Sequence, residues 1–322
     1  MGEFDLIDRY FKRPVRRAAL GVGDDCALLA PAPGMQLAVS SDMLVEGRHF
    51  LSTVDPARLG HKALAVNLSD LAACGAKPLA FTLALAMPQV DKRWLAGFAK
   101  GLLALADEHG CELVGGDTTR GPLNICITVF GEVPTGAALL RSGARAGDDI
   151  WVSGTLGDAR LALEVFRGTL QLPAEAFEIA RARMEQPTPR VALGLALRGI
   201  ATAAVDVSDG LVGDLGHVLA ASGVGAALNA DAVTQLIALG APASGAALGV
   251  EVQRTCALAG GDDYELVFTA PASARKAVEQ AGHASATPVA RIGCIEAAPG
   301  LRIVDAGGAP LTQRFTAFDH FG

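Results

Sequence analysis

The chain lacks the short motifs that mark several large enzyme classes. It has no GxxxxGK[ST] string, which excludes a P-loop nucleotide site, and no HRD or DFG string, which excludes the protein-kinase fold. It also has no GxSxG or Cys–His signature of a covalent nucleophile. The string GVGDDC near the start does not match GxGxxG, which argues against a dinucleotide-binding fold. Any chemistry must therefore rest on other groups.

Cysteine pairs and long apolar runs are missing as well. None of the six cysteines has CxxC spacing, so zinc or dithiol chemistry is not indicated, and we expect reduced, mostly buried thiols. The longest apolar stretch, 63–87, is interrupted by Asp70 and Lys77, so no transmembrane helix is expected. The first residues, MGEFDLIDRYFKRP, have no apolar signal segment. These absences predict a cytoplasmic protein without a membrane partner.

Aromatic and charged residues are sparse, at 5% and 19%, whereas 51% of the residues are hydrophobic. This composition excludes disorder, and 322 residues are enough for two domains of ordinary size. A formal net charge of −7 argues against a nucleic-acid partner, which would need a basic face. The histidines share no metal-ligand spacing, and only His49, seven residues after Asp42, remains a candidate site residue.

Strand-like and helix-like patterns alternate along the chain. In the first part, strands are expected at 36–42, 79–88 and 124–133, and helices at 56–76 and 91–109. In the second part, strands are expected at 150–154, 201–207, 264–271, 290–297 and 301–308, and helices at 158–167, 189–199, 209–222 and 274–282. A segment rich in glycine and charge, 134–149, separates the parts. We therefore predict domains of residues 1–137 and 138–322 in an α/β fold with mixed sheets.

Six short acidic motifs are the most informative feature of the sequence. Their carboxylates sit among Gly, Ser and Thr, where backbone and ligand can approach closely. The motifs are GVGDD (21–25), SSD (40–42), NLSD (67–70), GGDTTR (115–120), DVSDG (206–210) and GGDD (260–263). Hard oxygen ligands of this kind suit Mg²⁺, which binds one or two carboxylates, several waters and substrate phosphates. The motifs together predict a site that holds two phosphate compounds.

Four of the motifs also have an interpretation without a ligand. GVGDD and GGDD could be tight turns. Asp70 could belong to an exposed polar stripe of its helix, although a carboxylate among Ala, Leu and Val is costly unless it is paired or bound to metal. In DVSDG, a Ser or Asp would cap the following helix, which accounts for one of Asp206 and Asp209 but not for both. By contrast, SSD forms the end of the strand predicted at 36–42, and α/β proteins place ligands at strand ends. In GGDTTR, the glycines would let backbone N–H groups approach a phosphate.

Nine strings in register extend this pattern over nearly the whole chain. They are GEFDLIDRYF, GVGDDCALL, SSDMLVEGRHF, KALAVNLSDLAACGAKP, LVGGDTTRGP, RSGARAGDDIWVSGTLGD, DVSDGLVGDLGH, GGDDYELVF and FDHF. In this order they resemble the thiamine-monophosphate kinase family of the aminoimidazole-ribonucleotide-synthetase-like (PurM-like) superfamily. The resemblance implies two PurM-like α/β domains, the N-terminal one binding ATP and metal and pairing with its partner's in a homodimer. It also implies Mg²⁺-dependent transfer of the ATP γ-phosphoryl group to thiamine monophosphate.

The resemblance assigns roles to residues at the matching positions. The implied Mg²⁺ ligands are Asp25, Ser40, Ser41, Asp42, Asp70, Asp117, Asp206 and Asp209, of which Asp70, Asp206 and Asp209 are the implied catalytic residues. The implied ATP contacts are Gly116, Asp117, Arg141 and Ser208, and the implied substrate contacts are His49, Asp262 and Phe315. The chain differs from the usual family pattern at three positions: Asp262 replaces Glu, Ser41 replaces Thr, and Phe315 replaces a larger aromatic residue.

The implied reaction needs no covalent catalysis by the protein. The acceptor is a phosphate monoester with a second pKa near ~6, so it is largely ionised at neutral pH and needs no strong general base. Positioning and charge neutralisation suffice, and we expect direct transfer without a phosphoenzyme. Two alternatives remain open. The chain could be another ATP-using enzyme of the superfamily, of the aminoimidazole ribonucleotide synthetase or selenophosphate synthetase type, or a non-catalytic regulator that binds Mg²⁺ and nucleotide.

Overall fold

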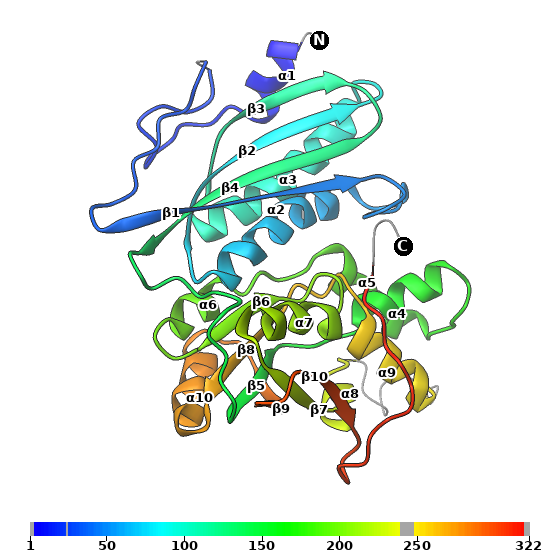
Figure 1. Cartoon of the computed structure of the whole chain (residues 1–322). Coiled ribbons are helices and arrows are strands. Elements are labelled where there is room, and N and C mark those ends of the chain that lie inside the picture. Colours follow the sequence, from blue (N-terminus) through cyan, green and yellow to red (C-terminus); the bar gives the residue numbers. More distant parts are fainter. Residues whose placement is uncertain (1–2, 24, 239–247, 319–322) are drawn as a thin grey trace. The chain divides into compact units, whose positions relative to one another are not determined.

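The computed structural model describes residues 3–23, 25–238 and 248–318 (Figure 1). The chain forms two compact units: an N-terminal unit of residues 1–71 and 76–136, and a C-terminal unit of residues 72–75 and 137–322. Asp24 of the GVGDD motif and the residues after Phe318 in the FDHF string lie outside the described residues. None of the described helices is both long and apolar enough to span a bilayer.

The N-terminal unit is built on a four-stranded sheet of order β1-β4-β2-β3. Its elements are α1 (Glu3–Tyr10), β1 (Met35–Val45), α2 (Pro56–Ala73), β2 (Lys77–Met87), α3 (Lys92–His109), β3 (Glu112–Arg120) and β4 (Asn124–Pro134). β4 is antiparallel to β1 and β2, while β2 and β3 are parallel. Helices α2 and α3 lie on one face of this sheet (Figure 1), where Phe81, Leu83 and Ile127 are buried. The strands and helices expected in this part of the chain are confirmed.

Strand β3 was not expected from the sequence patterns. Most of it is the GGDTTR motif, whose Gly115, Gly116 and Asp117 have low strand propensity. The segment is a strand because its backbone pairs with β2 over eight register positions, across an irregularity between Phe81 and Thr82. Tertiary pairing therefore overrides local propensity at this motif.

The backbones of α2 and α3 are in direct contact at two glycines. A Cβ atom built on Gly101 would lie 1.8 Å from the carbonyl oxygen of Ala57, and one on Gly60 would lie 2.1 Å from that of Phe98. Neither position has room for a methyl group, so these helix-interior glycines are set by packing.

Replacing Gly101 by Ala is expected to destabilise the N-terminal unit by at least ~2 kcal/mol, because the helices must separate to admit the methyl group. Gly216 is a matched control: it also lies inside a helix, but a Cβ there has nothing within 4 Å. Gly216→Ala is expected to stabilise by roughly 0.5–1 kcal/mol through helix propensity alone. Urea denaturation followed by circular dichroism measures both, and equal effects would contradict the close packing.

The C-terminal unit contains a six-stranded sheet of order β10-β7-β9-β5-β8-β6, in which only the β10–β7 pair is parallel. Its strands are β5 (Asp148–Ser153), β6 (Ala203–Asp206), β7 (Gly225–Asn229), β8 (Leu266–Pro271), β9 (Val289–Glu296) and β10 (Gly300–Val304). Its helices are α4 (Asp158–Phe166), α5 (Ala174–Glu185), α6 (Val191–Leu197), α7 (Leu211–Ser222), α8 (Ala230–Thr234), α9 (Val250–Ala259) and α10 (Arg275–Ala284), with a short 3₁₀ turn η1 (Ala272–Ala274). Apolar side chains such as Ile150, Leu161 and Leu215 form its core. The expected elements are confirmed, and α5, β7, α8 and α9 are additional.

Candidate functional site

Ser40 and Asp70 are in direct contact in the N-terminal unit. The Ser40 hydroxyl, on β1, donates to Oδ2 of Asp70, on α2, at 2.5 Å. Three residues earlier on α2, Oδ1 of Asn67 accepts the backbone N–H of Asp42 at 3.1 Å. Ser40 and Asp42 are two positions apart on one strand, so their side chains share the face covered by α2 and α3. The fold thus gathers two carboxylates and a hydroxyl from the SSD and NLSD motifs.

Ser41 and Asp117 lie on the opposite face of the same sheet. The Ser41 hydroxyl is 3.0 Å from Oγ1 of Thr128. Asp117 is exposed, and across the sheet it pairs with Ala84, which pairs with Cys126. Asp42 pairs with Ile127, the residue next to Cys126, so its side chain points to the other face. Because side chains alternate along a strand, the pleat divides the predicted metal ligands of this sheet into two groups.

Gly116 is required by strand pairing. Its φ is 147°, and a Cβ atom there would lie 1.9 Å from the carbonyl oxygen of Leu83 on β2. Any side chain is excluded for this reason alone. A glycine at this predicted ATP contact is therefore explained without reference to a ligand, and its role in ATP binding stays a prediction.

His49 is fixed to the end of β1. Its backbone N–H donates to the carbonyl of Val45, and its ring Nδ1 accepts the Val45 N–H, both at 3.0 Å. The nearly buried Lys62 donates to the carbonyl of His49 at 3.3 Å. With Nδ1 acting as an acceptor, the proton of the neutral ring is on Nε2.

Two segments meet at the loop of residues 207–210, which joins β6 to α7 in the C-terminal unit. The N–H groups of Asp262 and Tyr264 donate to the carbonyls of Ser208 and Val207, each at 2.8 Å. Asp206, at the end of β6, is only 6% exposed. The DVSDG and GGDD motifs, far apart in sequence, are thus joined by backbone hydrogen bonds.

The C-terminal segment reaches the same loop. The N–H of Phe318 donates to the carbonyl of Asp209 at 3.1 Å, and Phe315 is half-buried against the apolar core of this unit. The predicted substrate residues Asp262 and Phe315 therefore both lie on segments bonded to the loop that carries Ser208 and Asp209.

Asp262 and Tyr264 have left-handed backbone conformations, with φ of 67° and 51°. For a bulky residue such as Tyr264 this costs about 1–3 kcal/mol, and such strain is concentrated at functional sites. The Tyr264 hydroxyl donates to Oδ1 of Asp262 at 3.1 Å and so restricts its carboxylate. The predicted substrate contact is held in place from within its own segment.

The expectation that a Ser or Asp of DVSDG caps α7 is wrong. The N-cap residue is Gly210, which has φ of 118° and no side-chain cap. Instead, Oδ2 of Asp214 accepts the N–H groups of Ser208, Asp209 and Gly210 at 3.0, 3.0 and 3.1 Å. Burial raises the pKa of Asp214 to about 6, and the charge of Asp209 also raises it, while the amide bonds lower it. Sequence reasoning missed Asp214, although an Asp within the apolar run LVGDLGHVL was a usable signal.

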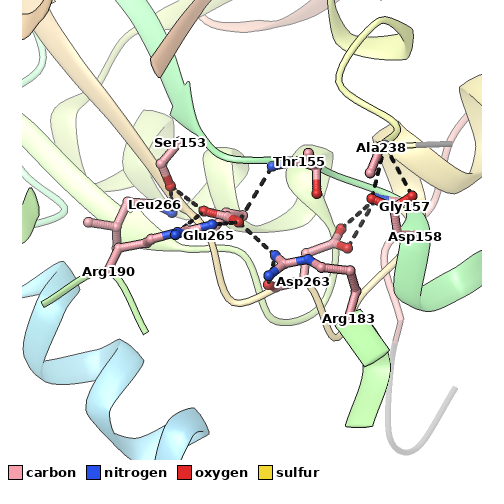
Figure 2. A network of polar contacts seen from close by, with 10 residues as sticks. All are labelled: Ser153, Thr155, Gly157, Asp158, Arg183, Arg190, Ala238, Asp263, Glu265 and Leu266. Carbon is pink, nitrogen blue, oxygen red and sulfur yellow. Dashed lines mark hydrogen bonds and ion pairs between the residues drawn. The ribbon is translucent and has the colours of Figure 1, made fainter. Parts of the chain in front are cut away.

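A buried polar network follows the GGDD motif (Figure 2). The carboxylate of Glu265 is fully buried and accepts hydrogen bonds from Arg183 at 2.6 Å and from Arg190 at 2.6 and 2.5 Å. Both carboxylate oxygens of Asp263 accept the N–H of Gly157, at 3.0 and 2.9 Å, and burial raises the pKa of Asp263 well above its ordinary value. Asp263 and Glu265 therefore belong to the interior of this unit, and Asp262 is the partly exposed acid of the motif.

The remaining predicted ligands are more exposed. Arg141 is exposed, and its carbonyl accepts the Ser222 hydroxyl at 3.1 Å. Asp25 is exposed in the segment before β1. Within residues 3–23, 25–238 and 248–318, no three His, Cys, Asp or Glu side chains form a ready metal-binding group. The Mg²⁺ ligand set stays a prediction, and a Mg²⁺ site that is completed by phosphate oxygens and water needs few protein ligands.

Comparisons with known proteins define the class. Residues 23–133 match the family described as AIR synthase related protein, N-terminal domain, and residues 145–306 match the corresponding C-terminal domain. The thiamine-monophosphate kinase of Salmonella typhimurium is 47% identical over 99% of this chain and 98% of its own. The thiamine-monophosphate kinase of Stenotrophomonas maltophilia, whose crystal structure is known, is 46% identical in sequence, and its structure has a TM-score of 0.84 over 96% of both chains. AaThiL, solved in complex with AMPPCP and TMP, is 27% identical, with a TM-score of 0.73 over 99% of this chain and 96% of its own.

The two sheets and the paired domain matches define an AIR synthase-related protein with two α/β domains. Identity of 40% or more to several curated kinases extends over 99–100% of the chain. The chain therefore belongs to the thiamine-monophosphate kinase family. The resemblance drawn from the nine strings and the predicted PurM-like fold are confirmed.

Proposed function

We propose that the chain transfers the γ-phosphoryl group of ATP to thiamine monophosphate, giving thiamine diphosphate and ADP. The main support is near full-length similarity to curated thiamine-monophosphate kinases, at up to 47% identity. AaThiL, which aligns over 99% of this chain, was solved with AMPPCP and TMP together. Because the reaction uses ATP, the proposal includes a cytoplasmic location.

The acidic motifs are proposed to hold Mg²⁺. The gathered oxygens of Ser40, Asp42 and Asp70 are the hard donors that Mg²⁺ prefers, so the residues present fit the ion. The full proposed set is Asp25, Ser40, Ser41, Asp42, Asp70, Asp117, Asp206 and Asp209. Bound Mg²⁺ would neutralise charge on the phosphate oxygens at a site lined by carboxylates.

The protein's own groups orient the two phosphates. Gly116, Asp117, Arg141 and Ser208 are the proposed ATP contacts, and His49, Asp262 and Phe315 the proposed contacts to thiamine monophosphate. The ring of His49, whose Nδ1 accepts the N–H of Val45, is proposed to face the phosphate of thiamine monophosphate. The acceptor phosphate is already ionised, so the site holds it in line with the γ-phosphoryl group and removes no proton from it. Transfer is therefore direct, without a phosphoenzyme.

The proposed function is tested by coupled measurement of ADP release. ATP with thiamine monophosphate and Mg²⁺ is expected to give sustained ADP formation, and omission of either the acceptor or Mg²⁺ is expected to abolish it. A panel with aminoimidazole ribonucleotide synthetase and selenophosphate synthetase substrates should give no ADP above background. Binding of Mg·ATP without acceptor-dependent turnover would instead favour a regulator, and turnover with another acceptor alone would overturn the proposal.

A homodimer through the N-terminal sheet is also proposed. Alternate residues of the edge strand β1, namely Leu37, Val39 and Met43, are 42%, 56% and 52% exposed. By the strand alternation they lie on the face opposite α2 and α3, where no described helix of the unit covers β1. An exposed apolar strip on an edge strand favours pairing with a second copy.

Val39→Lys is expected to convert the dimer to a monomer. The mass measured by light scattering after size-exclusion chromatography should then fall from twice the chain mass of 32.9 kDa to the chain mass itself. The reason is that a charged side chain would be buried without a partner in the dimer. Leu28→Lys is the matched control, because Leu28 is an equally exposed leucine, at 55%, outside this strip. If wild type is a monomer, or if Leu28→Lys dissociates the dimer equally, the strip is not the interface.

A further inference from the structure

The amide groups of the loop 207–210 are all bonded within the protein. The N–H of Val207 donates to the carbonyl of Glu265 at 2.8 Å, and those of Ser208, Asp209 and Gly210 converge on one oxygen of Asp214. Successive N–H groups of this kind form a concavity that binds anions. Here the anion is a carboxylate of the chain itself, and Asp214 is only 4% exposed.

The carbonyls of the same loop are fixed from the other side. Those of Val207 and Ser208 accept Tyr264 and Asp262, and that of Asp209 accepts Phe318. The loop backbone is thus clamped by hydrogen bonds on both of its polar sides. The side chains of Ser208 and Asp209 are half-exposed, so a ligand can contact them.

Capping of α7 alone does not explain this arrangement. A Ser or Asp at the N-cap position is the ordinary solution, and both residue types lie directly before Gly210. Neither caps the helix, because Gly210 occupies the N-cap position. Asp214, in the first turn of α7, accepts the N–H groups of the loop instead. The arrangement spares the side chains of Ser208 and Asp209 from a capping role.

We propose that Asp214 is a positioning residue that holds the loop 207–210 in the conformation that presents Ser208 and Asp209 to the metal-bound nucleotide. The inference rests on the proposed function, in which these two residues contact ATP and Mg²⁺. It assigns no direct ligand contact to Asp214, which acts through the backbone of its neighbours.

The test compares two isosteric variants of the full-length chain. Asp214→Asn keeps an oxygen acceptor but loses the charge that binds three amides. Asp158→Asn is the matched control, since Asp158 is also fully buried in the first turn of a helix, α4, and accepts a backbone N–H, that of Ala238, at 3.1 Å. The readouts are the Kd for Mg·AMPPCP by calorimetry, the KM for thiamine monophosphate, and the melting temperature.

Asp214→Asn is expected to raise the Kd for Mg·AMPPCP at least ~10-fold, because hydrogen bonds from three amides to a charged group are weakened. The KM for thiamine monophosphate is expected to rise by a smaller factor, because the segments of Asp262 and Phe315 are bonded to the same loop only through its carbonyls. Asp158→Asn is expected to lower the melting temperature and leave both constants within about 2-fold. An unchanged nucleotide Kd in folded Asp214→Asn, or an equal rise in both constants, would overturn the proposal.

A measurement on the wild type covers the case in which Asp214→Asn fails to fold. Hydrogen exchange of the peptide containing Ser208–Gly210 is expected to be slow before any nucleotide is added, because the amides are already bonded to a buried oxygen. Fast exchange that slows only with Mg·AMPPCP would overturn the proposal. Absence of thiamine-monophosphate-dependent ADP formation in the wild type would instead overturn the proposed function, so the two failures are distinguishable.

Discussion

Asp70→Asn is expected to lower kcat by roughly 10²–10³-fold while the protein stays folded, because Asp70 is a proposed ligand to the charge-neutralising metal. The fold should tolerate the change, since the hydroxyl of Ser40 donates to Asp70 and an amide oxygen can accept the same bond. The measurement is steady-state ADP release together with a melting curve. A melting temperature within a few degrees of wild type separates loss of chemistry from loss of structure.

Glu108→Gln is the control for this variant. Glu108 is an exposed acid on α3 in the same unit, so its neutralisation removes the same charge at a position without a proposed role. Its kcat should match that of wild type. Full activity of Asp70→Asn would remove Asp70 from the site.

Glu265→Gln is expected to destabilise the C-terminal unit by about 3–5 kcal/mol, because two buried guanidinium groups lose their shared counter-charge. Arg183 and Arg190 are only 17% and 14% exposed, so water can replace the lost carboxylate only in part. For a unit of this size the melting temperature should fall by roughly 6–20 °C. Calorimetry of the full chain measures the shift.

Glu164 provides the matched comparison in the same unit. It is also flanked by two arginines, Arg160 at 2.6 Å and Arg167 at 3.1 Å, but these are 32% and 51% exposed. Glu164→Gln is therefore expected to cost less than ~1 kcal/mol. Equal shifts for the two variants would show that burial of the Glu265 network does not control its contribution.

The sequence predicted the elements whose apolar spacing is regular. Helix α3 is clear, for example, because Leu95, Phe98, Leu102 and Leu105 recur at helical spacing and all are buried. Strand β3 could not be predicted in this way, because Gly115, Gly116 and Asp117 become a strand only by pairing with β2. Strand β7, GAALN, is likewise poor in β-branched residues.

The candidate site was predicted in its residue types but not in its geometry. Small residues around the acids of DVSDG indicated the loop that contains Ser208 and Asp209. The apolar residues before Asp42 predicted the strand on which it lies. The pleat that separates Asp117 from Asp42 depends on a register irregularity, and a single sequence does not reveal it. The clamp by Asp214 depends on where α7 begins, which sequence patterns locate only to within a few residues.

The central claim is that the acidic motifs bind the cations that join ATP to thiamine monophosphate. The most direct measurement is an anomalous difference map from crystals grown with Mn²⁺, AMPPCP and thiamine monophosphate. We predict Mn²⁺ peaks at about 2.0–2.2 Å from carboxylate oxygens of Asp70 and Asp209, with phosphate oxygens completing the coordination. Both ligands bound with no Mn²⁺ peak in contact with either aspartate would contradict the claim.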